Sequence, residues 1–296
     1  MPRVVLILNP TKTEDKDAFV QQVTEACTTK GLGAPEVCPT TEDDPGEGMA
    51  RRAVEQGATL VLAAGGDGTI RAVCAGRGGS GVPLGVLPLG TGNLLARNLD
   101  LPLDLGEALQ VALAGRDRVL DLARATAGQQ PATSFVVMAG LGFDAQMMAD
   151  APEGLKKAVG WPAYLLSGLH HLRDPAGELE LVIDDGPPIT RPARGVVIGN
   201  VGELQGGLAL LPDAVPDDGI LDVVLLAPRN LVHWARLVAR LLARRPDRSV
   251  SRWTARHVEV RTAAPTEVQL DGEPLGQVRS LVVDVDPGVL VVWVRP

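Results

Sequence analysis

The stretch "TLVLAAGGDGTIRAVCAG" (Thr59–Gly76) decides the fold of the first third of the chain. It opens with a short, continuous apolar run, which is typical of a strand buried on both faces. It closes with the apolar spacing of a helix, and the glycine-rich loop Gly65–Thr69 joins the two. Glycines this close together let backbone N–H groups approach a phosphate. The aspartate among them, Asp67, needs an explanation because a phosphate would repel it.

The same alternation of apolar runs and helical spacing extends to both sides of this stretch. The expected strands lie at 3–9, 34–40, 59–66 and 83–90, and the expected helices at 16–31, 44–57, 69–76 and 93–100. Alternating strands and helices predict a parallel sheet with helices on both faces. Ligands bind such sheets at the carboxyl ends of the strands, where this chain has the loops "NPTK", "CPTTED", "GGDGT" and "LGTGN".

After about Asp121 the pattern changes to strands separated by turn signals. The expected strands lie at 134–143, 177–184, 191–200, 220–227, 257–262, 266–273, 280–287 and 290–296, with helices near 155–172 and 231–243. We therefore predict an α/β N-terminal domain with a parallel sheet (1–125) and a β-rich, sandwich-like C-terminal domain (126–296). An alternative for the last strands is that they pack back on the first domain.

Composition argues against several classes of protein. The net charge of −8 opposes nucleic-acid binding, and 3% aromatic residues leave few surfaces for base stacking. Three cysteines without metal-site spacing (Cys27, Cys38 and Cys74) favour free thiols in a reducing cytosol. No apolar stretch reaches the roughly 18 residues of a membrane span. We predict a cytoplasmic protein without a nucleic-acid partner.

Two glycine loops are the first candidates for chemistry. The loop Gly65–Thr69 lacks the GxxxxGK pattern and any nearby lysine, so a nucleotide there would be held by backbone donors and a helix N-terminus. Asp67 would then cap the following helix, act through Mg²⁺ or a water, or orient another catalytic group; the alternative is a tight turn plus cap without a nucleotide. In "LGTGN" (Leu89–Asn93), Thr91 or Asn93 is expected to cap the helix that follows.

Three further turns carry candidate groups or a motif. The stretch "PDAVPDDGILDV" (Pro212–Val223) clusters four aspartates and suits a hard divalent cation, although a solvated turn is the alternative. In "QLDGEPL", Asp-Gly between two apolar runs predicts a hairpin, and either Asp271 or Glu273 there is a candidate general base. The stretch "GLGFDA" (140–145) is predicted to be a tight turn.

Taken in order, these pieces resemble the diacylglycerol kinase catalytic-domain family, specifically its soluble bacterial lipid kinases and their sphingosine-kinase relatives. The matching stretches are "LNPTK" at 8–12, "PTTEDD" at 39–44, "GGDGTI" at 65–70, "PLGTGN" at 88–93, "GLGFDA" at 140–145, "GNVGELQGGLALLPDAVPDDGILDV" at 199–223 and "LDGEP" at 270–274. The similarity spans nearly the whole chain. Each motif is weak by itself, and the ordered set is specific.

The resemblance implies an ATP-dependent lipid kinase with Mg²⁺, a membrane lipid as substrate, and diacylglycerol as the favoured acceptor. ATP would be held by Asn9, Thr40, Gly65, Gly66, Asp67, Gly68, Thr69 and Thr91. Glu273 would take the proton from the lipid hydroxyl, and the further catalytic carboxylates would be Asp67, Asp271 and Asp121. A structural Mg²⁺ would bind Asp218 and the carbonyls of Val215 and Ile220.

The chain departs from the family pattern at two places. Many relatives carry Asn-Glu where this chain has Arg71 and Ala72, and its first loop reads "NPTKTED" in place of a glycine-bearing sequence. We expect Lys12 and Arg71 to compensate as phosphate partners. Residues 229–252 form the most basic segment, and a basic amphipathic helix containing Trp234 favours contact with an anionic membrane, here the inner face. A core-packed helix is the alternative.

Two other functions are alternatives to a lipid kinase. NAD kinase would require a "GPTGSTAY"-like segment, which is absent. A non-catalytic nucleotide- or lipid-binding regulator on the same fold is the second alternative. A sphingoid base, a ceramide, an undecaprenol-like alcohol or phosphatidylglycerol stays open as acceptor. The oligomeric state is also open, with pairing of the apolar C-terminal strands in a homodimer as one alternative.

Overall fold

The chain is organised as two compact units. The computed structural model describes residues 2–142, 177–203, 210–228, 230–243 and 247–296. The α/β unit comprises Met1–Leu122 and Pro287–Pro296, and the β-rich unit comprises Ala123–Asp286. Two strands, β5 (Arg116–Ala127) and β14 (Glu273–Val294), pass from one unit into the other.

The α/β unit contains the predicted parallel sheet, and the structure gives its strand order as β2-β1-β3-β4. In chain order, the elements of this unit before β5 are β1 (Val4–Leu8), the 3-10 turn η1 (Pro10–Lys12), α1 (Lys16–Thr29), β2 (Glu36–Pro39), α2 (Glu47–Glu55), β3 (Leu60–Gly65), α3 (Asp67–Arg77), β4 (Leu84–Pro88), α4 (Leu94–Asn98) and α5 (Leu105–Ala114). The end of β14 adds one more parallel strand beside β4, where Val292 pairs with Leu84. The sheet of the N-terminal unit is thus extended by the last residues of the chain.

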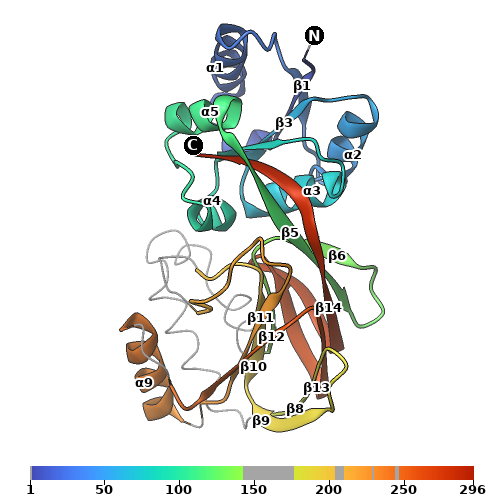
Figure 1. Cartoon of the computed structure of the whole chain (residues 1–296), viewed down its shortest axis with the longest axis vertical. Helices are drawn as coiled ribbons and strands as arrows, with labels where there is room; N and C mark the ends of the chain where they lie inside the picture. Colours follow the sequence, from blue (N-terminus) through green and yellow to red (C-terminus); the bar gives the residue numbers. More distant parts are fainter. Residues whose placement is uncertain (1, 143–176, 204–209, 229, 244–246) are drawn as a thin grey trace. The chain divides into compact units, whose positions relative to one another are not determined.

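Helices cover both faces of this sheet because its strands are apolar on both sides. Alternate residues of β1 pack with Phe19 and Val23 of α1 and with Leu109 of α5. Ile7 faces the other way, toward α2 and α3, close to Val73. Figure 1 shows α1 and α5 on one side of the strands of this unit, and α2 and α3 on the other. The helices cover the faces of the sheet, and the loops lie at the carboxyl ends of its strands.

Helix α5 was not predicted, although its sequence carries a start signal. The carboxylate of Asp104 accepts a hydrogen bond from the amide of Glu107 at 3.0 Å, which caps the helix. An aspartate followed three residues later by a glutamate is a variant of the capping box. Strands β5 and β12 (Val250–Ala255) were also not predicted as strands.

The β-rich unit is built from antiparallel pairs. Its order is β12-β11-β10-β7-β13, with β8 pairing both β13 and β9, and β5 pairing both β6 and β14. These elements are β6 (Thr133–Phe135), β7 (Met138–Gly142), β8 (Gly177–Ile183), β9 (Ile189–Ala193), β10 (Gly195–Gly199), β11 (Leu221–Leu226), β13 (His257–Leu270) and helix α9 (Leu231–Leu242). The predicted β-rich domain is confirmed. The helix expected near 155–172 lies outside the described residues.

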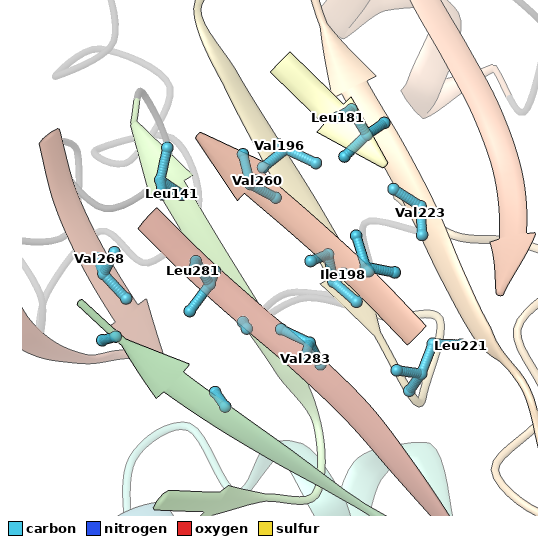
Figure 2. Close-up of a cluster of buried hydrophobic side chains, with 14 of the residues drawn as sticks. Leu141, Leu181, Val196, Ile198, Leu221, Val223, Val260, Val268, Leu281 and Val283 are labelled. Carbon is cyan, nitrogen blue, oxygen red and sulfur yellow. The ribbon is translucent and has the colours of Figure 1, made fainter. Parts of the chain in front are cut away.

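Strand β13 is one bent strand where the sequence predicted two. Its pairing with β14 is irregular between Arg261 and Thr266. Before this point β13 pairs with β8, and after it with β7, so one strand serves two sets of neighbours. The core of the unit lies between these strands, and Figure 2 shows Leu141, Ile198 and Leu281 among its buried side chains. In the part of the chain that the structure describes, no helix is long and apolar enough to cross a bilayer.

Candidate functional site

The loops predicted to bind a ligand lie at one edge of the parallel sheet. The amide of Asn9 donates to the carbonyl of Ala64 at 2.8 Å, and the amide of Leu89 donates to that of Gly65 at 2.8 Å. Across β1, the amide of Thr40 donates to Leu8 at 2.8 Å. These bonds join the carboxyl ends of four neighbouring strands. The structure therefore brings together the loops with the nucleotide residues predicted in this unit.

Asp67 holds two of these loops together. Its carboxylate accepts hydrogen bonds from the amides of Asn93 at 2.9 Å and Leu94 at 2.6 Å, which begin helix α4. Asp67 thus caps α4, while it is itself the first residue of α3, whose N-cap residue Gly66 makes no side-chain cap bond. The aspartate among the glycines therefore has a partner of its own, 26 residues further along the chain.

The expected cap of α4 was wrong. Asn93 is left-handed, with φ 48°, and no side chain at this position caps the helix. Its side chain closes the loop instead: Oδ1 accepts from the amide of Gly90 at 2.9 Å, and Nδ2 donates to the carbonyl of Gly90 at 2.7 Å. Thr91 lies exposed at the tip of this loop.

The glycines of the two loops are needed for their close approach. A Cβ added to Gly90 would lie 2.7 Å from the Cα of Gly66, and one added to Gly92 would lie 2.6 Å from Oδ2 of Asp67. Both distances are too short for a real Cβ. At Gly90 the opposing atom is backbone, which cannot move aside as a side chain can, and at Gly92 it is the carboxylate that binds the amides of Asn93 and Leu94. A larger residue at either position would push the loops apart.

Lys12 brings a positive charge to the lysine-free loop. The side chain of Asn9 accepts from the amide of Thr11 at 3.0 Å, which forms the turn η1, and its Nδ2 donates to Oγ1 of Thr69 at 3.2 Å. From this turn Lys12 extends toward Gly66, where its Cε lies 3.7 Å from the position that a Cβ would take. Arg71 follows in the first turns of α3 and is half-buried.

In the β-rich unit, the predicted hairpin is confirmed at Asp271 and Gly272. Both have positive φ, 49° and 86°, and Leu270 pairs directly with Glu273. This is the geometry that a two-residue Asp-Gly loop favours. The two carboxylates of the turn are placed differently, because Asp271 is buried and Glu273 is exposed.

The aspartate-rich turn before β11 has a strongly negative environment. Partial burial and the charges of Asp218 and Asp213 raise the pKa of Asp222 to about 6. The carboxylate of Asp218 accepts from the amide of Ile220 at 3.1 Å. Across the residues described, no group of three or more His, Cys, Asp or Glu side chains is arranged for a metal ion. The predicted Mg²⁺ ligands, Asp218 and the carbonyls of Val215 and Ile220, are oxygen donors of the kind that Mg²⁺ prefers, and their binding of the ion stays a prediction.

Asp121 is a buried carboxylate of the α/β unit. Its side chain accepts from the amide of Gly288 at 2.7 Å, and the residue is 2% exposed. Gly288 has φ 64°, which favours glycine. This bond fastens β5 to β14.

Helix α9 confirms the helix expected near 231–243, but Trp234 is not on its surface. Trp234 and Leu237 are buried, whereas Val232 is 73% exposed. On the polar side, Arg236 binds Asp247 through Nε at 2.9 Å. Hydrogen bonds from Ser249 and Arg236 keep the pKa of Asp247 at about 2 although burial opposes ionisation.

Comparisons with known proteins agree along the whole chain. The diacylglycerol kinase catalytic domain matches residues 3–125, and the YegS C-terminal NAD kinase beta sandwich-like domain matches residues 135–294. A protein of Yersinia enterocolitica named "Probable lipid kinase YegS-like" is 30% identical over 298 residues, which cover 98% of this chain and 96% of that relative. A relative of the same name from Yersinia pestis is 32% identical over 287 residues, 93% of this chain and 91% of its own length.

Solved structures show the same fold. A diacylglycerol kinase structure from Bacillus anthracis has a TM-score of 0.73 at 19% identity, covering 99% of this chain and 97% of that one. A yeast NADH kinase complexed with NADH has a TM-score of 0.55 at 14% identity, covering 100% and 84%. With both domains matched in order and relatives matched over nearly their full length, the chain belongs to the YegS-like lipid kinases of the diacylglycerol kinase catalytic-domain family.

Proposed function

We propose that this lipid kinase transfers the γ-phosphoryl group of ATP to the hydroxyl of diacylglycerol and so forms phosphatidic acid. The observation that carries the proposal is the pair of glycine loops that Asp67 holds together at the carboxyl edge of the parallel sheet. Ligands bind such sheets at this edge, and phosphates bind at helix N-termini. The start of α3, where the N-cap residue Gly66 has no side chain to cap the helix, would supply backbone donors there.

The nucleotide would be held by residues of this edge: Asn9, Lys12, Thr40, Gly65, Gly66, Asp67, Gly68, Thr69, Arg71 and Thr91. Lys12 would supply the positive charge that a GxxxxGK loop takes from its own lysine. A carboxylate has about four acceptor positions, so Asp67 can hold the second loop and still face the metal-bound end of the nucleotide. Phosphoryl transfer depends mostly on positioning and charge stabilisation, which these groups provide.

Glu273 would act as the general base in this proposal. It is exposed at the end of a rigid two-residue hairpin, where a lipid hydroxyl can approach it. Asp218, with the carbonyls of Val215 and Ile220, would hold a structural Mg²⁺. Partial burial is the first cause of the raised pKa of Asp222, and a bound ion would offset the second, the negative charges of Asp218 and Asp213.

Phosphate transfer from labelled ATP to a lipid panel in mixed micelles with Mg²⁺ tests the function. Diacylglycerol is expected to be labelled, and Glu273→Ala to lower the rate about 10²- to 10⁴-fold. Glu267→Ala is the matched control, because Glu267 is a partly exposed glutamate on the same hairpin that binds Gln277; its rate should be unchanged. Transfer only to a sphingoid base or to phosphatidylglycerol would show that this lipid, and not diacylglycerol, is the acceptor. ATP binding without transfer to any lipid would favour a regulator.

We also propose that residues 229–252 contact an anionic bilayer, here the inner face of the membrane. Helix α9 buries Trp234, so the contact would rest on its basic side and on exposed Arg248. Each basic residue near such a surface is worth about 1 kcal/mol, so Arg248→Glu is expected to weaken binding to anionic vesicles about tenfold or more. Arg191→Glu on β9 makes the same charge change elsewhere in the unit. Equal loss in both variants, measured by vesicle sedimentation, would contradict a local contact.

A further inference from the structure

One carboxylate organises the backbone before β7. The amides of Val136, Val137 and Met138 all donate to Asp271, at 3.0, 2.9 and 2.9 Å. The amide of Asp271 donates back to the carbonyl of Met138 at 2.9 Å. Asp271 is 3% exposed, and the three residues that it binds are buried as well. Consecutive amides that converge on one anion form a nest, and here the anion is the chain's own side chain.

The opposite side of the same segment is bound by the Gly-Asn motif after β10. The side chain of Asn200 donates to the carbonyl of Val136 at 3.3 Å, and its amide donates to that of Val137 at 2.9 Å. Asn200 is itself 2% exposed. The backbone of 136–138 is therefore fixed from two sides, by Asp271 and by Asn200. This segment is a rigid support, to which the Asp-Gly turn is attached.

The turn has a second attachment at Gln269. Its Oε1 accepts from the amide of Gly272 at 2.7 Å, and the residue is 2% exposed. Asp271 adopts the left-handed conformation, which is strained for residues other than glycine and is tolerated by aspartate when its side chain bonds nearby. With both bonds made, little freedom is left in the backbone that leads into Glu273.

We infer that Asp271 is a positioning residue that acts on the reaction through Glu273. The inference rests on the proposed function of Glu273 as general base. Buried and bound to three amides, the carboxylate of Asp271 is placed to hold the turn, and exposed Glu273 is placed to meet the substrate. Misplacing a reacting group by about 1 Å costs about 10²-fold in rate. Asp271→Asn keeps the shape of the side chain but replaces one acceptor oxygen by an NH₂ donor. That donor would face a backbone N–H, which is also a donor, so the hydrogen bond is lost.

A double-mutant cycle tests this, with kcat, the KM for ATP and the melting temperature measured for each variant. Asp271→Asn is expected to lower kcat about 10²-fold with little change in the KM for ATP. In Asp271→Asn/Glu273→Gln the rate should equal that of Glu273→Gln alone, because residues that act as one unit are not additive. Asp184→Asn is the matched control: Asp184 also has positive φ, and accepts from the amides of Arg256 and His257. Its kcat should match the wild type.

Other outcomes separate the hypotheses. If the double variant is slower than Glu273→Gln by the full Asp271→Asn factor, Asp271 acts independently and the inference fails. It also fails if Asp271→Asn lowers only the melting temperature, with kcat of the folded protein unchanged. An unchanged rate in Glu273→Gln overturns the proposed base itself. Should Asp271→Asn not fold, Gln269→Leu removes the bond to Gly272 while Asp271 stays in place, and it is expected to lower kcat in the same way; wild-type kcat there would overturn the inference.

Discussion

Asp67→Ala is expected to lower the free energy of unfolding of the α/β unit by about 3 kcal/mol or more, because two hydrogen bonds to a charged group are lost. The amides of Asn93 and Leu94 would keep no acceptor from this side chain. The loop that carries Thr91 would separate from Gly65–Thr69. For a nucleotide held by both loops, we expect kcat/KM for ATP to fall about 10²-fold or more.

Urea unfolding and steady-state kinetics on the same preparations check this result. Asp15→Ala is the matched control, because Asp15 caps α1 through the amide of Ala18 alone. Its loss is expected to cost about 1 kcal/mol and to leave kcat/KM unchanged. Asp67→Asn retains one acceptor oxygen and should lie between the two. An Asp67→Ala protein with the ATP kinetics of the wild type would show that the second loop does not take part in nucleotide binding.

Removal of the last ten residues, Pro287–Pro296, is expected to prevent the α/β unit from folding. Val289 accepts from the amide of Gly79 at 2.8 Å, and Val291 accepts from Arg77 at 3.2 Å. Arg77 is 2% exposed, and burial lowers its pKa. Without this end of β14 the guanidinium of Arg77 would lose the carbonyl of Val291, and β4 would become an open apolar edge.

Circular dichroism and limited proteolysis of the truncated chain test this expectation. The expected result is loss of the cooperative transition of the α/β unit and cleavage within residues 2–122. A single substitution distinguishes the loss of the strand from the shortening of the chain. Val292→Asp places a charge at a fully buried position and is expected to have the same effect as the truncation, whereas Val119→Asp, at a residue that is 48% exposed, is the control. A cooperative transition retained in the truncated chain would contradict the role of the terminal strand.

The local parts of the fold were predictable because their signals are local. Apolar runs predicted β1, β3 and β4, and Asp-Gly predicted the two-residue hairpin. The edge of the sheet at which the loops gather follows from strand direction alone. The exposed position of Glu273 and the buried position of Asp271 were not predictable, because both residues lie on the same turn. Asp271 is buried because the amides of Val136, Val137 and Met138, which are distant in the sequence, donate to its carboxylate.

The missed features depend on partners far apart in the chain. Asp67 was expected to cap the helix that follows it or to act through a metal. Its carboxylate instead caps α4 through the amides of Asn93 and Leu94, a contact that forms only when two loops meet. The bend in β13 arises from its two sets of neighbours, which the composition of the strand does not record. The sequence shows that Trp234 lies on the apolar face of a helix, but it does not show whether that face packs against the protein or faces a membrane. In the structure Trp234 is buried.

The dependence of the N-terminal sheet on the last strand reverses the usual order of events during synthesis. Domains generally fold from the N-terminus as the ribosome extends the chain. Here the β-rich unit is continuous, and all of its residues have been made once Asp286 is added. The α/β unit must wait until Val292 has been made and has left the exit tunnel, because Val292 pairs with Leu84 of β4. The half of the protein that is translated first is therefore the half that is completed last.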